Sequence, residues 1–193
     1  FCSMVFGQNH WTTNSHLYQN TMSMQVGLTI SGEEIAADNF EIAAFYDGNV
    51  VGNGMFEKIK DSYQTSLFVY GPENGALIQF KLYDHNSNME ISLPSEKIEF
   101  VIDGNIGTIS APRKINFFAA AKIDNVYFAT LQEAVNACGS GTSTITLLDD
   151  CGEDVTIKQE EGVNVIIDGD GFAYSGTFTI HGKARYEGEE TLT

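Results

Sequence analysis

The most constraining feature of this sequence is an alternation of apolar and polar side chains that begins near residue 20. Apolar residues occupy every second position within residues 24–30 and again within residues 78–82. Turn-forming sequences separate such runs, among them Asp-Gly-Asn at residues 47–49 and Gly-Pro-Glu-Asn-Gly at residues 71–75. Successive side chains of a strand point to opposite faces, so this period predicts half-buried strands joined by hairpins. Roughly six to eight short strands without a helical pattern predict an antiparallel, immunoglobulin-like β-sandwich over residues 8–118.

The pattern changes after residue 118, where a single segment has the signature of a helix. Thr130 and Glu133 form a Thr-x-x-Glu capping box. Apolar residues then follow at i, i+3, i+4 and i+7, counted from Leu131. Gly139 occupies the position where a C-terminal cap belongs. These residues predict one short amphipathic helix.

Four short apolar runs follow the predicted helix at regular intervals. They are Ile145–Leu147, Val155–Ile157, Val165–Ile167 and Phe178–Ile180. Runs two apart begin 20 and 23 residues from each other, which is the length of one coil in a parallel β-helix. Residues 119–193 are therefore expected to form the N-terminal cap and first coils of a parallel β-helix, with an antiparallel meander as the alternative. About two coils can be counted, so we expect further coils beyond Thr193 or a partner chain to cover the last edge.

The first seven residues are apolar or small and read as the end of a secretory signal peptide. A membrane-spanning helix needs about 20 apolar residues, so this segment is too short for one. Val5 and Gly7 supply the small residues that a cleavage site before Gln8 requires. We expect residues 1–7 to be a signal-peptide remnant. The alternatives are a buried first strand and a lipoprotein acylated at Cys2.

Charge excludes several classes of partner. Acidic residues outnumber basic ones by 26 to 10, and the formal net charge is −16. Binding to nucleic acid or to anionic lipid rests on basic residues, so we expect neither nucleic-acid binding nor membrane insertion. The apolar content of 42% is enough to build buried cores and excludes a disordered chain.

Two cysteines remain if Cys2 is removed with the signal peptide. They are Cys138, at the end of the predicted helix, and Cys151, after the first apolar run. An even pair in an exported protein predicts one disulfide. The alternative is two buried thiols, because sequence spacing does not show whether the two Cα atoms come close enough to bridge.

The predicted sandwich resembles an N-terminal module of exported Bacteroidetes surface proteins over about 110 residues. The matching parts are Trp11 near Tyr18, Glu-Ile-Ala-Ala-Phe at 41–45, Phe-Lys-Leu-Tyr-Asp at 80–84, and Gly107-Thr108 before Pro112. The resemblance implies a secreted or surface-delivered protein, commonly exported by the type IX route. That route needs a C-terminal sorting domain, which this sequence does not contain.

Residues 121–150 are similar to the entry unit of right-handed parallel β-helix regions in bacterial surface proteins. In that unit an edge strand and a short helix cap the first coil, and Thr-Ile-Thr-Leu-Leu-Asp-Asp at 144–150 corresponds to the first rung. The pattern occurs in adhesins and in pectate-lyase-like enzymes alike. It therefore implies a fold and not a chemistry.

One segment carries oxygen ligands at the spacing of a calcium loop. Asp84, Asn86, Asn88 and Glu90 occupy alternate positions, as the first ligands of such a loop do. The loop lacks a glycine at its sixth position and has Ser95 at its twelfth, where a bidentate Glu is expected. These four residues are candidate calcium ligands, and a hairpin turn bonded to its own backbone is the alternative reading.

The sequence contains no recognisable catalytic motif. The four histidines, at positions 10, 16, 85 and 181, lie on separate segments and lack metal-binding spacing. No nucleophile elbow, phosphate loop or dinucleotide fingerprint occurs. We therefore expect no catalytic residues and no cofactor other than calcium.

Several aromatic residues could form a platform for sugar rings, although aromatic residues in strands are more often core. They are Trp11, Tyr18, Tyr46, Tyr63, Tyr70 and Tyr83. The function that we expect is non-catalytic: adhesion, or binding of an extracellular glycan or protein at the cell surface. The alternative is an accessory N-terminal part of a β-helix carbohydrate-active enzyme such as a polysaccharide lyase.

Overall fold

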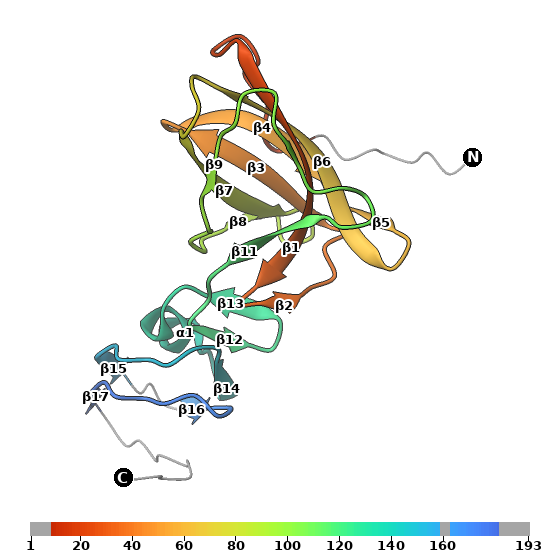
Figure 1. Ribbon diagram of the computed structural model, residues 1–193. Helices are drawn as coiled ribbons and strands as arrows, with labels where there is room; N and C mark the ends of the chain where they lie inside the picture. The colour runs from red at the N-terminus through yellow and green to blue at the C-terminus, as the bar shows by residue number, and fades with distance from the viewer. Residues whose placement is uncertain (1–8, 159–162, 182–193) are drawn as a thin grey trace. The chain divides into compact units, whose positions relative to one another are not determined.

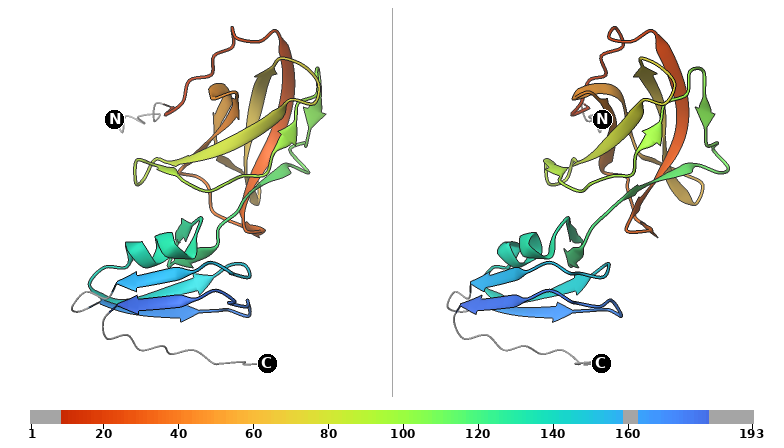
Figure 2. Two further views of the ribbon diagram at one scale, coloured as in Figure 1. Left: turned by 90° about the vertical axis from the view of Figure 1, so that its left-hand side faces the viewer. Right: turned by 60° about the vertical axis from the view of Figure 1, so that its left-hand side comes forward.

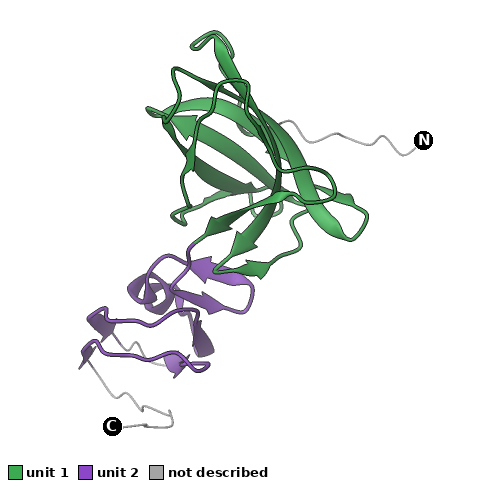
Figure 3. Cartoon of the chain, in the orientation of Figure 1, with its two compact units in different colours: residues 1–117 green, residues 118–193 purple. Residues whose placement is uncertain are grey.

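The computed structural model describes residues 9–158 and 163–181, and this part of the chain consists of strands with a single helix. The prediction of an all-β protein is confirmed. The chain forms two compact units, residues 1–117 and 118–193 (Figure 3). The signal-peptide remnant predicted at residues 1–7 lies outside the described residues.

Unit 1 contains eleven of the strands, in two sheets (Figure 1). The strands are β1 (Asn20–Ile30), β2 (Glu33–Glu34), β3 (Phe40–Tyr46), β4 (Asn49–Met55), β5 (Glu57–Ile59), β6 (Ser62–Gly71), β7 (Leu77–Asp84), β8 (Met89–Ile91), β9 (Ile98–Glu99), β10 (Asn105–Ile106) and β11 (Arg113–Phe117). One sheet has the order β10-β1-β6-β5, with β2 and β11 also paired to β1. The other has the order β4-β3-β7-β8, with β9 paired to β7.

The alternating apolar residues of unit 1 are buried, as the sequence predicts. In β7, Ile78, Phe80 and Leu82 are buried, and the side chains between them are exposed. Glycines let β4 come close to β6, because a Cβ at Gly52 would lie 2.7 Å from the carbonyl oxygen of Phe68. The core of unit 1 therefore lies between the two sheets.

The sheet built on β1 is not wholly antiparallel, which corrects the expectation of an antiparallel sandwich. β1 pairs antiparallel with β6 but parallel with β10 and β11, with Leu28 opposite Ile115. A parallel pair needs a long connection between its strands, and here most of the unit serves as that connection. A period of two residues is the same in both directions, so the sequence pattern does not reveal strand direction.

Unit 2 contains the remaining strands and the helix. They are β12 (Ala121–Ile123), β13 (Val126–Phe128), α1 (Leu131–Ala137), β14 (Gly141–Leu147), β15 (Val155–Lys158), β16 (Val163–Asp168) and β17 (Phe178–His181). All four strands predicted after the helix are present. Figure 2 shows α1 lying along one side of the stacked strands of this unit.

The predicted capping residues start α1, but its end differs from the prediction. Thr130 Oγ1 accepts a hydrogen bond from the backbone N–H of Glu133, and the Glu133 carboxylate accepts one from Ala129 N–H. The helix ends at Cys138 in an extended conformation. The left-handed glycine is Gly141, with φ of 99°, and not Gly139. A Gly-Ser-Gly sequence offers two positions for a turn, and local propensity does not choose between them.

The strands of unit 2 pair in parallel with partners 22 or 23 residues away. β14 pairs β16 with Gly141 opposite Val163, and β15 pairs β17 with Val155 opposite Phe178. An isolated parallel bridge joins Cys151 to a residue 23 positions later. Among the described strands that follow α1, consecutive strands do not pair with each other, so the alternative of an antiparallel meander is wrong. Antiparallel pairing in the described part of unit 2 involves β12, which pairs with β13 and β14.

The core of unit 2 lies between α1 and the strands β12, β14 and β15. Its fully buried side chains include Leu131, Ile145 and Leu147. The equivalent residues of β16 and β17 are only partly buried, and Ile180 is 41% exposed. No helix in the described residues is long and apolar enough to cross a membrane.

Candidate functional site

A short N-terminal segment, residues 9–14, lies across the outer face of β3 and its neighbours. Alternation along β3 places Glu41, Ala43 and Phe45 on this face and Ile42 on the face toward the core. Residues 41–44 are nevertheless all buried. Both faces of β3 are therefore covered, one by the core and the other by the N-terminal segment.

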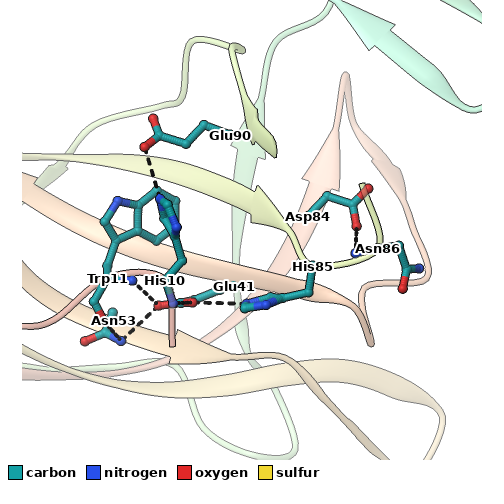
Figure 4. A network of polar contacts seen from close by, with 8 residues as sticks. All are labelled: His10, Trp11, Glu41, Asn53, Asp84, His85, Asn86 and Glu90. Atoms are coloured by element: carbon teal, nitrogen blue, oxygen red, sulfur yellow. Dashed lines mark hydrogen bonds and ion pairs between the residues drawn. The ribbon is translucent and has the colours of Figure 1, made fainter. Parts of the chain in front are cut away.

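Glu41 anchors this segment to β3 (Figure 4). Its carboxylate accepts hydrogen bonds from the backbone N–H of His10 at 2.6 Å and of Trp11 at 3.2 Å. The side-chain amide of Asn53 donates a third, at 3.0 Å. His85 Nε2 lies 3.2 Å from the same carboxylate. The Glu41 side chain is 0% exposed, so these partners replace the water that a buried carboxylate loses.

Aromatic rings surround this anchor. The His10 ring stacks on Tyr83 with centroids 3.8 Å apart and an interplanar angle of 6°. Trp11 meets Tyr83 and Phe45 edge-on, at 6.0 Å and 5.9 Å. Trp11 is itself 8% exposed. Its burial makes it part of the structure of this face and removes it from the candidate sugar platform.

A hollow of about 590 Å³ opens on the outer face of β3, next to Phe45, the ring that Trp11 contacts. It is lined by residues 45–48 and by Leu77, Gln79 and Lys81 of β7. Gln79 pairs with Phe45 across the two strands, and Leu77 and Lys81 are the alternate residues on either side of it. The hollow thus combines two aromatic residues, one aliphatic side chain, an amide, a carboxylate and an ammonium group.

The Lys81 ammonium is held by two neighbours on this face. It lies 4.9 Å from the centroid of the Phe45 ring and 3.6 Å from Glu90 Oε2. Both charged side chains are about half exposed, at 53% and 46%, so water screens the pair. The ammonium can therefore leave Glu90 for another acceptor at small cost.

The four candidate calcium ligands lie in and beside the β7–β8 hairpin. Asp84 Oδ1 accepts from the backbone N–H of Asn86 at 2.8 Å, and Oδ2 accepts from Ser87 Oγ at 2.9 Å. Asn88 has a left-handed backbone, with φ of 55°. Glu90 interacts with Lys81 and with the ring of His10, at 3.3 Å. These contacts are those of a self-bonded turn.

The same hydrogen bonds act on the acidity of Asp84. Burial alone works to raise its pKa, but donation by Asn86, Ser87 and Asn39 outweighs burial and lowers the pKa below its usual value. Within residues 9–158 and 163–181, no three or more His, Cys, Asp and Glu side chains are grouped so as to hold a metal. Calcium binding at this hairpin stays a prediction.

Both cysteines predicted to pair are free thiols in the structure. Cys138 Sγ donates to the carbonyl oxygen of Ala134 at 3.4 Å. Burial raises the pKa of the Cys138 thiol and outweighs the opposing hydrogen bond with Ser143. Cys151 is 7% exposed and belongs to the core of unit 2. The disulfide stays a prediction for the oxidised protein.

The structure joins residues that the sequence pattern kept apart. His10 and His85 lie on separate segments, yet both contact Glu41. The sequence analysis missed the roles of Glu41 and Asn53. A charged residue inside the apolar run Phe40–Tyr46 was a usable signal, because such residues are almost never fully buried unless paired.

The other aromatic candidates do not gather at one place. Tyr18 meets Tyr46 edge-on at 5.7 Å, so these two are neighbours near the hollow. Tyr63 packs under the Lys58 ammonium, at 5.8 Å, on the other sheet. The six residues therefore do not form one platform.

Comparison of the chain with protein-family models, with curated proteins and with solved structures finds no match.

Proposed function

We propose that this chain is a non-catalytic, exported segment of a cell-surface protein that binds an extracellular ligand. The observation that carries the proposal is the hollow beside Phe45, where apolar and polar side chains line one open surface. Ligand sites are concave and combine apolar walls with a few placed polar groups. The Glu41 anchor supports this role because it holds the neighbouring Trp11 and His10 in place.

Export and surface location rest on sequence features. The apolar segment at residues 1–7 and the resemblance of residues 8–118 to a Bacteroidetes surface module support delivery to the cell exterior. In this proposal unit 1 is an immunoglobulin-like sandwich and export follows the type IX route. The ligand is an extracellular glycan or protein.

For unit 2 we propose the capped start of a right-handed parallel β-helix. Parallel partners separated by 22 and 23 residues support it, because each ladder then joins one coil to the next. The packing of α1 against β12, β14 and β15 also supports it. Gln132 adds to this cap, since its amide both donates to and accepts from the backbone of Thr156, at 3.0 Å and 2.7 Å.

The second candidate function is an accessory part of a β-helix carbohydrate-active enzyme such as a polysaccharide lyase. The parallel ladders of unit 2 favour it, because such enzymes and adhesins share this arrangement. In the full-length protein, coils with clustered Asp, Lys and Arg support the enzyme. Coils lined with Thr, Ser and Asn support the binding protein.

The test is a binding screen and a turnover assay on the same purified chain. The chain is applied to immobilised neutral and acidic glycans and to extracellular matrix proteins, and it is separately incubated with acidic polysaccharides. We expect saturable binding to at least one ligand and no unsaturated or shortened products. Product formation, or the absence of saturable binding across the panel, contradicts the proposed function.

A further inference from the structure

We propose that the hollow beside the β3–β4 hairpin binds a neutral hexose unit of a glycan, an inference that rests on the proposed binding function. The hollow is lined by the end of β3, the turn that follows it, and alternate residues of β7. Its volume of about 590 Å³ lies within the range of small-ligand sites.

An irregularity in β3 and β4 shapes the hollow. Ala44 lies opposite Gly52, whereas Phe45 lies opposite Val50, so β4 carries an extra residue at this point. Such bulges bend a strand and redirect side chains, and they are frequent beside binding and active sites. The turn itself is tight, because Asp47 and Gly48 both have positive φ, at 49° and 74°.

The apolar part of the hollow suits the C–H face of a pyranose ring. Phe45 supplies an aromatic ring at the hollow, with Trp11 edge-on to it at 5.9 Å and the Lys81 ammonium 4.9 Å from its centroid. Leu77 supplies an aliphatic wall and is 50% exposed. An apolar side chain that is half exposed at the rim of a hollow gains most when a ligand covers it.

The polar part suits hydroxyl groups, each of which both donates and accepts hydrogen bonds. The Gln79 amide can donate and accept, the Asp47 carboxylate accepts, and the Lys81 ammonium donates. A sugar carries adjacent hydroxyls around its ring, and this set offers both kinds of partner along one wall. A purely apolar ligand leaves these groups without partners and loses affinity.

Charge favours a neutral sugar over an acidic one. The hollow holds one carboxylate, Asp47, and one ammonium, Lys81, so its own formal charge is zero. Glu90 lies 3.6 Å from that ammonium and already offsets it. A net charge of −16 over the chain repels polyanionic glycans such as uronates and sulfated chains.

The experiment measures binding of the 193-residue chain to defined oligosaccharides by calorimetry. The probes are neutral hexasaccharides of glucose, mannose and galactose, with oligogalacturonate as the acidic comparator. We expect saturable binding of at least one neutral probe and weaker binding of the comparator. Gln79→Ala is expected to raise the Kd of that probe about tenfold, because one hydrogen-bonding side chain is lost.

Two further variants test whether the sugar binds in the hollow and not elsewhere on unit 1. Asp47→Asn keeps a residue that tolerates the left-handed turn, and it is expected to raise Kd severalfold by removing the charged acceptor. Phe68→Ala is the matched control: this aromatic residue is 65% exposed but lies on β6 of the other sheet, and its removal is expected to leave Kd unchanged. Thermal melts of all variants confirm that they are folded.

The outcomes separate this inference from the proposed function. If no neutral hexasaccharide binds, or if Gln79→Ala and Asp47→Asn bind as the unaltered chain does, the neutral-sugar site is wrong. The proposed function survives that result when the screen finds saturable binding to another ligand. It fails only when the screen finds no ligand at all or when the chain degrades a polysaccharide.

Discussion

In unit 1 the buried side chains come from two sheets that face each other, whereas in unit 2 they come from one helix, α1, and from the strands packed against it. The difference shows in the distance along the sequence between paired residues. In unit 1, Leu28 pairs with Ile115, and in unit 2, Ile145 pairs with Ile167. Unit 1 forms its core only when distant segments meet, while unit 2 pairs strands that lie closer together in the sequence.

The two units also treat buried polar groups differently. Unit 1 buries a carboxylate, Glu41, and surrounds it with donors. In unit 2 the corresponding carboxylate, Glu153, also accepts from a backbone N–H, that of Leu131 at 2.9 Å, but it is only partly buried. Polar substitutions are therefore expected to reduce the free energy of unfolding most in unit 1.

The largest effect is expected for Glu41→Ala in unit 1. The substitution leaves the N–H groups of His10 and Trp11 and the amide of Asn53 without their acceptor in a buried place. We expect a loss of about 3–5 kcal/mol in the free energy of unfolding, measured by urea denaturation. Glu41→Gln keeps one acceptor oxygen and should lose less. Equal losses for both variants would contradict the anchoring role.

The next effect concerns the two cysteines of unit 2. If Cys138 and Cys151 pair on oxidation, the closed loop should stabilise unit 2 by about 3 kcal/mol, following chain-entropy estimates for a loop of about 15 residues. The measurement compares urea denaturation of oxidised and reduced protein. Titration of free thiols in the unfolded, unreduced protein is the control, and reaction of both Cys138 and Cys151 there would rule out the disulfide.

Gln132→Ala tests the helix cap of unit 2. Its amide makes two hydrogen bonds to the backbone of Thr156, which lose their partner in the variant. We expect unit 2 to lose about 2 kcal/mol of stability in urea denaturation, while unit 1 is unaffected. Asn136→Ala is the matched control, because the Asn136 side chain accepts a hydrogen bond from the Gln132 amide on the same helix face but takes no part in the two bonds to Thr156. A larger loss for the control would show that the cap acts through another contact.

Calcium binding at the β7–β8 hairpin is expected to have a smaller effect. With a dissociation constant of about 1 mM, typical of weak extracellular sites, 10 mM calcium would stabilise unit 1 by about 1.4 kcal/mol. The melting temperature is compared in calcium and in EDTA, with Asp84→Asn as the control variant. Identical melting temperatures in both solutions mean that the hairpin is only a turn.

The smallest effects are pH-dependent and have opposite signs in the two units. The lowered pKa of Asp84 stabilises unit 1 above the ordinary Asp pKa, and this contribution disappears as the pH falls through the lowered value. In unit 2, burial, with the nearby charges of Cys151, Asp154 and Glu153, raises the pKa of Tyr174 to about 12. Its contribution is complete below about pH 10, the ordinary Tyr pKa, and is lost as the pH rises toward 12.

Absorbance titration of the phenols measures the second of these effects. The unaltered chain should show the ionisation of Tyr174 near pH 12, and Tyr174→Phe should remove that step. Asp84→Asn should reduce the acid sensitivity of unit 1 and leave the alkaline step unchanged. An alkaline step that persists in Tyr174→Phe would assign the raised pKa to another residue.

Local pattern was sufficient to predict several elements of both units, although unit 1 has eleven strands where six to eight were expected. The strands containing Ile78 and Leu82, the hairpin at Asp47 and the helix start at Thr130 each depend on a few adjacent residues. The period of the apolar runs in residues 119–193 also pointed to pairing of strands two apart, and the structure has that pairing. The candidate site was predicted less well, because only Tyr46 among the candidate residues lines the hollow.

The sequence by itself determined where chain segments are extended, where they turn and which face of each strand is apolar, because those properties follow from neighbouring side chains. Only the tertiary structure decided that β1 pairs parallel with β11, and that the carboxylate of Glu41 receives donors from residues about 30 positions earlier in the chain. It also placed Gln79 and Lys81 beside Phe45. Contacts of this kind depend on which distant segments come together, and a local alternation of apolar and polar residues is the same for many such arrangements.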